Sequence, residues 1–214
     1  PILGEHFTPQ LEFSSDVERL ERIGVVGPYA LAVASLEPRK NFSRLLDAWD
    51  ELPADLRAAH QLVVVVSAQW LQGAVRRRLA KMGRSGSVTL LDHLPAPDLA
   101  ALYRGARTLV FPSLAEGFGL PVAEAMACGA PVVTSDRSSM PEVADGAAVL
   151  VDPEDASSIA EGIERVLADQ GLRRDLRERG FESASRFTAE AVVPKLIEVY
   201  GRTAKRARVG LWHV

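Results

Sequence analysis

The sequence predicts an α/β fold in which six parallel strands form one doubly wound sheet with helices on both faces. Strand-like and helix-like segments alternate along most of the 214-residue chain. The strand-like segments are short, continuous apolar runs, as is typical of parallel strands that are buried on both faces. Glycines and prolines stand between the segments, where helices usually end and begin.

The expected elements follow from these runs in chain order. Strands are expected at 29–34, 62–66, 88–91, 108–111, 132–134 and 147–151. Between them, helical patterns occupy 42–52, 71–82, 98–104, 121–128 and 141–144. After Pro153 only C-terminal helices are expected, at 155–169, 172–185 and 188–206, and Pro194 should kink or restart the last of them.

Composition indicates one domain. We expect residues 1–10 to be an extended linker and 11–214 to share a single core, since 47% of the residues are hydrophobic.

No basic stripe is interleaved with aromatics, which argues against a nucleic-acid partner. The apolar runs are too short to span a bilayer, and the first residues do not resemble a signal peptide. Cys128 is the single cysteine, so a buried thiol and a cytoplasmic location are expected.

The strand order decides where a ligand would bind. Six strands with this connectivity most simply take the order 3-2-1-4-5-6, which places the topological switch between the first and fourth strands. The loop after the first strand is 35–41, and the segment after the fourth strand runs through 116–124. Ligands of such folds bind at the carboxyl ends of the strands, so both loops should line one crevice.

The segment after the fourth strand has the features of a site for phosphate and hydroxyl groups. Gly117 and Gly119 lead into a helix that begins at Leu120, so backbone N–H groups and the positive helix end can hold an anion. Glu116 and Glu124 flank this loop, and carboxylates accept hydrogen bonds from hydroxyls. Alternatively, Glu116 is a solvated loop carboxylate and Glu124 a helix-start carboxylate that complements the dipole, which fits Glu124 alone but not the pair, because the surrounding segment is almost wholly apolar. A glycoside hydrolase pair is the less favoured alternative, because it needs no phosphate cradle.

Two cations precede the next helix start in the other loop. Arg39 and Lys40 come directly before Asn41, and cations there oppose the helix dipole, so a compensating anion is expected. Exposed side chains that simply enter solvent are the alternative, but the neighbouring glycine loop favours phosphate binding. His93 follows the third strand and either lines the edge of the crevice or is an exposed loop histidine.

Other nucleotide and metal motifs are absent from the sequence. It has no G-x-x-x-x-G-K-[ST] motif, and Val122 stands where a dinucleotide fingerprint would require a third glycine. No cluster of histidines, cysteines or carboxylates has the spacing of a metal site, so neither a metal nor another cofactor is expected.

The segment from Glu116 to Val133 resembles the Glu-x7-Glu signature of retaining glycosyltransferases of the group 1 family, which have the GT-B fold of two Rossmann-like halves. Segments that match the family's order and spacing also lie at 37–41, 102–106, 111–113, 141–143 and 150–153. The resemblance covers the chain from about residue 20 onward. It implies the C-terminal, nucleotide-sugar-binding half of such an enzyme, with residues 1–9 similar to the interdomain linker and the acceptor-binding N-terminal domain missing.

The resemblance also implies roles for the candidate residues. Lys40 would hold the donor diphosphate, Glu124 the ribose hydroxyls and Glu116 the hydroxyls of the transferred sugar. The remaining expected contacts are backbone groups of the glycine loop and the end of the first strand, at Gly117, Phe118, Gly119, Leu120 and Ser35. Ala34 and Ser35 replace a Gly-Arg pair common in the family, which leaves open whether Arg39 supplies the second cation. Ser67 replaces a frequent glycine after the second strand, and base recognition therefore stays open.

The implied activity is metal-independent transfer of a hexose from GDP- or UDP-hexose to an acceptor, with retention at the anomeric carbon. The expected location is cytoplasmic, with peripheral association of the complete enzyme at the inner face of a membrane. A non-catalytic nucleotide-sugar-binding module and a subunit of a split glycosyltransferase are the alternatives. A GT-B-like epimerase or phosphorylase would need acid/base groups or a pyridoxal-binding lysine, and neither is evident.

Overall fold

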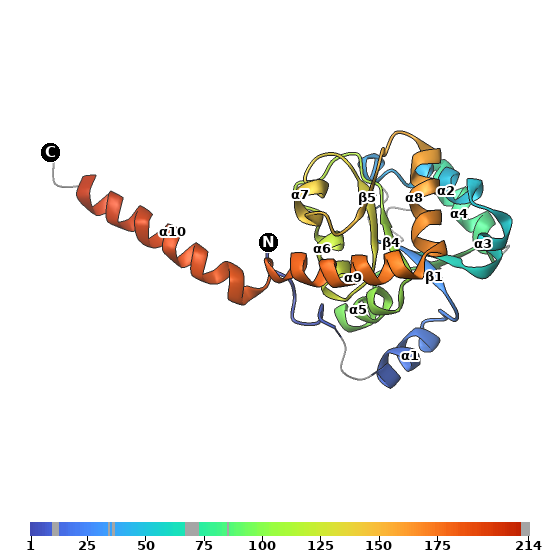
Figure 1. Cartoon of the computed structure of the whole chain (residues 1–214), viewed down its shortest axis with the longest axis horizontal. Helices are drawn as coiled ribbons and strands as arrows, with labels where there is room; N and C mark the ends of the chain where they lie inside the picture. Colours follow the sequence, from blue (N-terminus) through green and yellow to red (C-terminus); the bar gives the residue numbers. More distant parts are fainter. Residues whose placement is uncertain (10–12, 34, 36, 67–72, 85, 211–214) are drawn as a thin grey trace.

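The computed structural model describes residues 1–9, 13–33, 35, 37–66, 73–84 and 86–210. Its strands are β1 (Tyr29–Val33), β2 (Gln61–Val65), β3 (Val88–Leu91), β4 (Thr108–Phe111), β5 (Val132–Ser135) and β6 (Val149–Val151). They form one parallel sheet in the order β3-β2-β1-β4-β5-β6, at the centre of the domain in Figure 1. The predicted fold class and strand order are confirmed.

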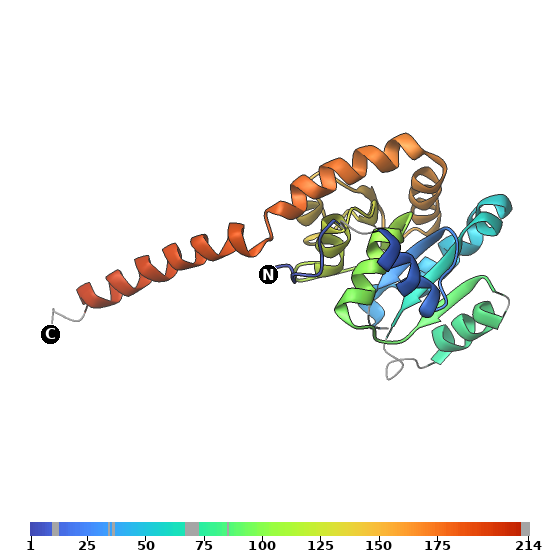
Figure 2. The ribbon, with the colours of Figure 1, turned by 90° about the horizontal axis from the view of Figure 1, so that it is seen from below.

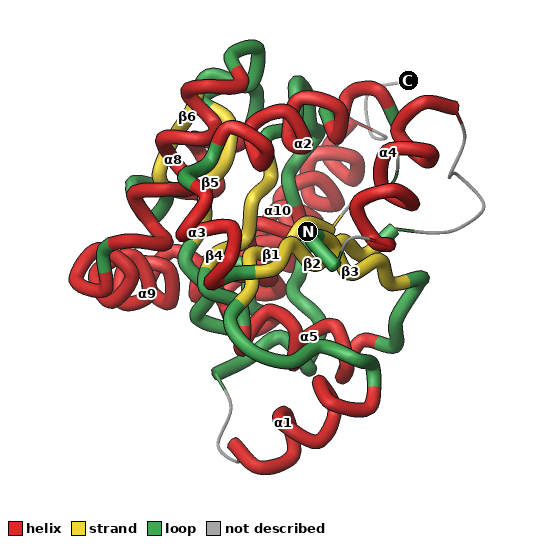
Figure 3. The backbone as a smooth tube through the Cα atoms, turned by 90° about the vertical axis from the view of Figure 1, so that its right-hand side faces the viewer, coloured by secondary structure: helices red, strands yellow, loops and turns green. Residues whose placement is uncertain are grey.

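Helices cover both faces of the sheet because the strand side chains alternate between two apolar cores. Leu31 and Leu109 lie in one core, whereas Ala32 and Val110 lie in the other. The first core is covered by α1 (Phe13–Arg22), α5 (Ala96–Gly105), α6 (Leu120–Ala127) and α7 (Met140–Ala144). The second is covered by α2 (Phe42–Glu51), α3 (Ala54–Ala59), α4 (Gly73–Arg84) and α8 (Ala156–Ala168), as Figure 3 shows from the side.

The last two helices differ in how they relate to the domain. Helix α9 (Gln170–Ser185) contributes Leu176 to one core and Ala184 to the other, and it packs against α6 and α8. Helix α10 (Ala189–Gly210) extends away from the domain in both Figure 1 and Figure 2. Its side chains Ile197, Val199 and Tyr200 are exposed.

Three local expectations need correction or extension. Helix α10 continues through Pro194 without a restart. The proline lies early in the helix, and the Glu190 carbonyl whose bond it removes belongs to an exposed residue that water can solvate. The short helix α3 and a 3₁₀ turn at Pro38–Lys40 were not predicted. Ala34, Ser67, Leu211 and Trp212 lie outside the described residues.

The first nine residues contain a turn at Glu5 and His6, form no helix or strand, and lie against the domain. The Leu3 N–H donates to the carbonyl oxygen of Phe187 at 2.9 Å. Phe7 is buried and meets Tyr103 edge-on, with ring centroids 5.9 Å apart. Arg104 donates to the carbonyl oxygens of His6 and Thr8, at 3.3 Å each. The start of the described chain is therefore fastened to α5 and to the loop before α10.

Candidate functional site

The loops after β1 and β4 meet at the carboxyl ends of these two strands. Lys40 Nζ lies 2.6 Å from Oε1 of Glu116, and Arg39 Nη1 lies 2.7 Å from Oε2 of the same carboxylate. The backbones are joined as well, because the Leu114 N–H donates to the carbonyl oxygen of Arg39 at 2.7 Å. The crevice predicted from the strand order therefore brings Arg39, Lys40 and Glu116 into direct contact.

The 3₁₀ turn at Pro38–Lys40 presents the two cations in different surroundings. The Lys40 side chain is 11% exposed, and its ammonium lies over the Phe111 ring at 5.3 Å from the centroid. Arg39 is more exposed, and Glu37 holds its Nε at 2.8 Å. The Ser35 hydroxyl donates to the other oxygen of Glu37 at 2.5 Å. Ser35 thus joins the cluster through Glu37, which orients Arg39.

Glu116 is the anion that compensates the two cations in this structure. Its side chain is only 8% exposed. Burial by itself would raise the pKa of Glu116, but hydrogen bonds from Lys40 and Arg39 lower it below its ordinary value. Arg39 and Lys40 predicted a bound phosphate as their partner, and in this structure the Glu116 carboxylate pairs with both.

Asn41 fixes the end of the same turn. The residue has a left-handed backbone, with φ of 62°, and stands at the N-cap position of α2 without a side-chain cap bond. Its amide instead donates to the carbonyl oxygens of Pro112 at 3.0 Å and Pro153 at 2.6 Å. Asn41 therefore ties the cation-bearing turn to the loops that follow β4 and β6.

The glycine loop between β4 and α6 is shaped by a close contact and by two serines. Gly119 has φ of 97°, and a Cβ at this position would lie 2.2 Å from the Cε of Met140. Ser138 Oγ donates to the Glu116 carbonyl oxygen at 2.7 Å and accepts from its N–H at 3.1 Å. Ser139 Oγ donates to the Phe118 carbonyl oxygen at 2.9 Å. These bonds hold the loop carbonyls on the protein side.

The N–H groups of the loop remain available. The backbone N–H groups of Gly117, Phe118 and Gly119 have no acceptor within the part of the chain that the structure describes. The Phe118 side chain packs edge-on against Phe187, with centroids 5.0 Å apart, whereas Gly117 and Leu120 are exposed. Backbone donors at the start of a helix suit an anionic or oxygen-rich ligand.

Glu124 occupies a different environment from Glu116. It lies on α6, is 9% exposed and accepts a hydrogen bond at 3.0 Å from the buried hydroxyl of Tyr103 on α5. Burial raises the pKa of Glu124 to about 7, and the bond from Tyr103 lowers it only in part. No described hydrogen bond or ion pair links Glu124 to Glu116. One carboxylate is thus ionised by its cationic partners, and the other is poised to exchange a proton near neutral pH.

His93 is a further candidate that no described contact joins to the cluster of Arg39, Lys40 and Glu116. It is exposed after β3, two strands away from β1, and its N–H donates to Asp92 at 2.7 Å. None of its described contacts reaches Glu116, Lys40 or Glu124. Its proposed place at the edge of the crevice remains a prediction.

Several residues of the site were missed by sequence reasoning. Ser138 and Ser139 follow β5, the neighbour of β4, so the strand order was a signal that could have pointed to them. The part played by Asn41 depends on two carbonyl oxygens distant in sequence, and the contact of Tyr103 with Glu124 depends on how α5 packs on α6. No local sequence pattern predicts either of these two contacts.

Known proteins share this arrangement of sequence and fold. A family model described as "Glycosyl transferases group 1" matches residues 21–183. The chain belongs to this family. The matched stretch contains the loops after β1 and β4 and all of α6, so the resemblance predicted from the Glu-x7-Glu segment is confirmed.

Two relatives of this glycosyltransferase chain are longer proteins. O-antigen chain mannosyltransferase B of Escherichia coli is 38% identical over 172 residues, which cover 80% of this chain and 45% of that protein. MMP alpha-(1->4)-mannosyltransferase of Mycolicibacterium hassiacum is 34% identical over 190 residues, covering 86% of this chain and 46% of that protein. The chain therefore spans slightly less than half the length of each of these two relatives.

Solved structures show the same relationship. Sucrose-phosphate synthase from Thermosynechococcus elongatus matches with a TM-score of 0.78 and 28% identity, over 94% of this chain and 51% of that chain. Anabaena HepE, solved in complex with UDP and glucose, shares the fold with a TM-score of 0.80 at 18% identity, over 94% of this chain and 55% of that chain. The glycosyltransferase chain has the fold of one half of a GT-B enzyme. In its described part, no helix combines the length and apolar content that crossing a bilayer requires.

Proposed function

We propose that the chain is the donor-binding half of a retaining hexosyltransferase, which moves a hexose from a nucleoside-diphosphate sugar to an acceptor. The observation that carries this proposal is the convergence of Lys40 and Arg39 on Glu116, beside the open N–H groups of the glycine loop. Cations, backbone donors and a carboxylate are the groups that a ligand with a diphosphate and sugar hydroxyls requires.

In this proposal the donor replaces the contacts that Lys40 and Arg39 make with Glu116 in the structure. The diphosphate binds Lys40 and Arg39, together with the N–H groups of Phe118 and Gly119. Glu116, released from its cations, accepts hydrogen bonds from hydroxyls of the hexose. As the bond between the hexose and the β-phosphate oxygen breaks, Lys40 and Arg39 stabilise the negative charge that develops on the departing diphosphate. These two cations supply the charge that a metal ion would otherwise provide, which supports a metal-independent reaction without a cofactor.

Glu124 is assigned to the ribose. A carboxylate can accept hydrogen bonds from two adjacent hydroxyls, and Tyr103 holds one of its oxygens in a fixed position. The names of the relatives favour a mannosyl donor among the hexoses, and GDP- and UDP-hexoses are the first candidates. The acceptor would be bound by a further domain, since the two mannosyltransferases named above are about twice as long as this chain. We place the complete enzyme in the cytoplasm, associated with the inner face of a membrane.

Calorimetric titration of the chain with GDP-mannose, UDP-glucose, and ADP and TDP sugars tests the proposal. We expect weak one-to-one binding to one base class and no transfer of the sugar by this chain alone. The exposed pair Lys81→Gln and Arg84→Gln, on α4, is a control for general electrostatic attraction. A dissociation constant of about 1 mM corresponds to a binding free energy of about −4 kcal/mol. Absence of heat with every donor at millimolar concentration would overturn the assignment.

A further inference from the structure

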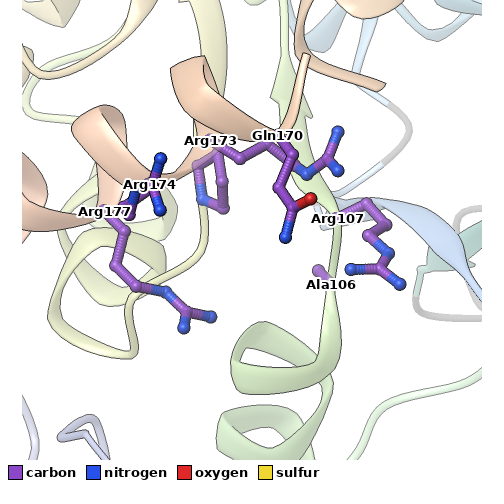
Figure 4. A pocket seen from close by; sticks show the side chains of 7 residues that line it. Ala106, Arg107, Gln170, Arg173, Arg174 and Arg177 are labelled. Atoms are coloured by element: carbon purple, nitrogen blue, oxygen red, sulfur yellow. The ribbon is translucent and has the colours of Figure 1, made fainter. Parts of the chain in front are cut away.

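A basic pocket lies at the edge of the sheet opposite to the Lys40–Glu116 cluster. Ala106 and Arg107 directly precede β4 and Pro131 directly precedes β5, so the pocket is at the amino ends of these strands. The first turns of α9 form its other wall, as Figure 4 shows. Its volume is about 250 Å³.

The walls of this pocket are strongly cationic. Gln170, Arg173, Arg174 and Arg177 follow the spacing i, i+3, i+4 and i+7, which places them on one face of α9. Arg107, the residue directly before β4, faces these α9 side chains. Four of the seven lining residues are arginines and none is acidic.

These arginines lack a matching set of acidic partners. In the described part of the chain, no ion pair involves Arg107, Arg173, Arg174 or Arg177. Asp169 is a carboxylate that acts on Arg173, and as the N-cap of α9 it also accepts the N–H of Leu172 at 3.0 Å. Burial and then the nearby charge of Arg107 lower the pKa of Arg173, against the effect of Asp169. The cluster therefore carries an excess of positive charge in which like charges are close.

Backbone carbonyls hold two of the guanidinium groups in place. Arg173 Nη1 donates to the carbonyl oxygens of Val166 and Leu167, each at 2.7 Å, and Arg177 Nε donates to that of Gly129 at 2.8 Å. A guanidinium has five N–H donors, so both groups keep donors for another partner. Arg107 and Arg174 make no side-chain hydrogen bond within the described residues. Arg173 and Arg177 are thus held in position by the backbone, whereas the side chains of Arg107 and Arg174 can turn toward a ligand.

We propose that this pocket is a binding site for a phosphate-bearing anion, separate from the donor site. Guanidinium groups bind phosphate oxygens through paired hydrogen bonds, and a phosphate or diphosphate carries enough charge to balance several arginines. A single carboxylate would leave most of this charge uncompensated. The ligand is a small soluble phosphate or the terminal phosphate of a lipid headgroup. The site does not depend on the function proposed for the opposite edge.

The soluble arm of the test uses inorganic pyrophosphate at constant ionic strength. The chain carries Lys40→Gln so that the donor site contributes little, and binding is followed on the side-chain Nε–H resonances of the arginines and by calorimetry. We expect one-to-one binding that shifts the resonances of the pocket arginines and weakens at least about tenfold in Arg107→Gln/Arg174→Gln, since the variant loses charge-assisted hydrogen bonds to the phosphate oxygens. These substitutions remove no described hydrogen bond, and circular dichroism checks that the variant folds.

The matched control is Lys81→Gln/Arg84→Gln, which removes two exposed positive charges from the last turns of α4. It should bind pyrophosphate as its parent does. The membrane arm measures flotation with phosphatidylcholine vesicles, with and without phosphatidic acid. The site is supported if either probe binds and if this binding is lost in Arg107→Gln/Arg174→Gln. The probe that binds shows whether the phosphate belongs to a soluble molecule or to a lipid headgroup. No binding of either probe, or equal loss in the α4 control, would overturn the proposal.

Discussion

Lys40 Nζ lies 2.6 Å from Glu116 Oε1, although the two residues are 76 positions apart and follow different strands. Both side chains are largely shielded, with 11% and 8% of their surfaces exposed. A shielded charge that loses its partner is costly, so Lys40 depends on Glu116, whereas Glu116 is also paired with Arg39. The Glu116 carboxylate thus lies in this structure at the position beside the cations that we assign to the donor diphosphate.

Replacing Lys40 with glutamine should weaken binding of a nucleoside diphosphate by at least about tenfold, because a charged hydrogen bond contributes about 1.5–3 kcal/mol. The effect on stability should be smaller, since Arg39 still pairs with Glu116. Titration with GDP and UDP, together with thermal unfolding, measures both effects. A Lys40→Gln chain that binds both nucleotides as tightly as the parent would contradict the role given to Lys40.

The elevated pKa of Glu124 makes the free energy of unfolding depend on pH. Between pH 4.5 and pH 7 the folded chain keeps a proton on this carboxyl that the unfolded chain has released. Stability from this group is therefore fully present at low pH and is lost as the pH rises toward 7, by on the order of 3 kcal/mol. Urea unfolding at pH 5 and pH 8 should show this loss in the parent but not in Glu124→Gln. Identical pH dependence in the two proteins would contradict the pKa assignment.

Binding of a nucleotide sugar should release a proton at Glu124. Ribose hydroxyls donate to an ionised carboxylate, so the ligand favours the deprotonated form and lowers the pKa. Affinity for the preferred donor should therefore rise between pH 6 and pH 8, and GDP-mannose or UDP-glucose has no phosphate that titrates in this range. Calorimetry at pH 6 in buffers of different ionisation enthalpy counts the released protons. A value near zero would mean that Glu124 does not meet the ribose as a carboxylate.

Glycine is required at position 119 by the left-handed backbone and by the close approach of Met140. Gly119→Ala would place a Cβ against the Met140 side chain at a φ of 97°, and strain in such a conformation costs about 1–3 kcal/mol. Gly117→Ala is the matched control in the same loop, because a Cβ there meets no atom within 4 Å. Chemical denaturation should show a clear loss of stability for Gly119→Ala and a change within about 0.5 kcal/mol for Gly117→Ala. Equal losses would show that the contact with Met140 does not shape the loop.

The sequence was sufficient to predict that Arg39, Lys40 and Glu116 share one crevice. Their loops follow buried apolar strands, and the strand order determines which loops are adjacent. The direct pairing was not predictable, because two cations at a helix start indicate an anion without specifying whether a ligand or a side chain supplies it. The bond from Tyr103 to Glu124 depends on the packing of two helices, which leaves no periodic signal in either segment.

Proline and asparagine signals were only partly informative for the same reason. Pro194 predicts an interruption, but an exposed carbonyl that water can solvate lets α10 continue. Asn41 stands at the N-cap position of α2, yet its amide donates to the carbonyl oxygens of Pro112 and Pro153. Local preference gives the position of such residues, and tertiary contacts decide the use of their side chains.

The most direct test of the central claim is a crystal structure of the chain with the nucleotide sugar that calorimetry selects. We expect the diphosphate within hydrogen-bond distance of Lys40 Nζ and the loop N–H groups. Glu116 should have turned to hydroxyls of the hexose, and Glu124 should contact the ribose. A donor bound elsewhere, with Lys40 and Glu116 still paired as they are in the free chain, would contradict the account.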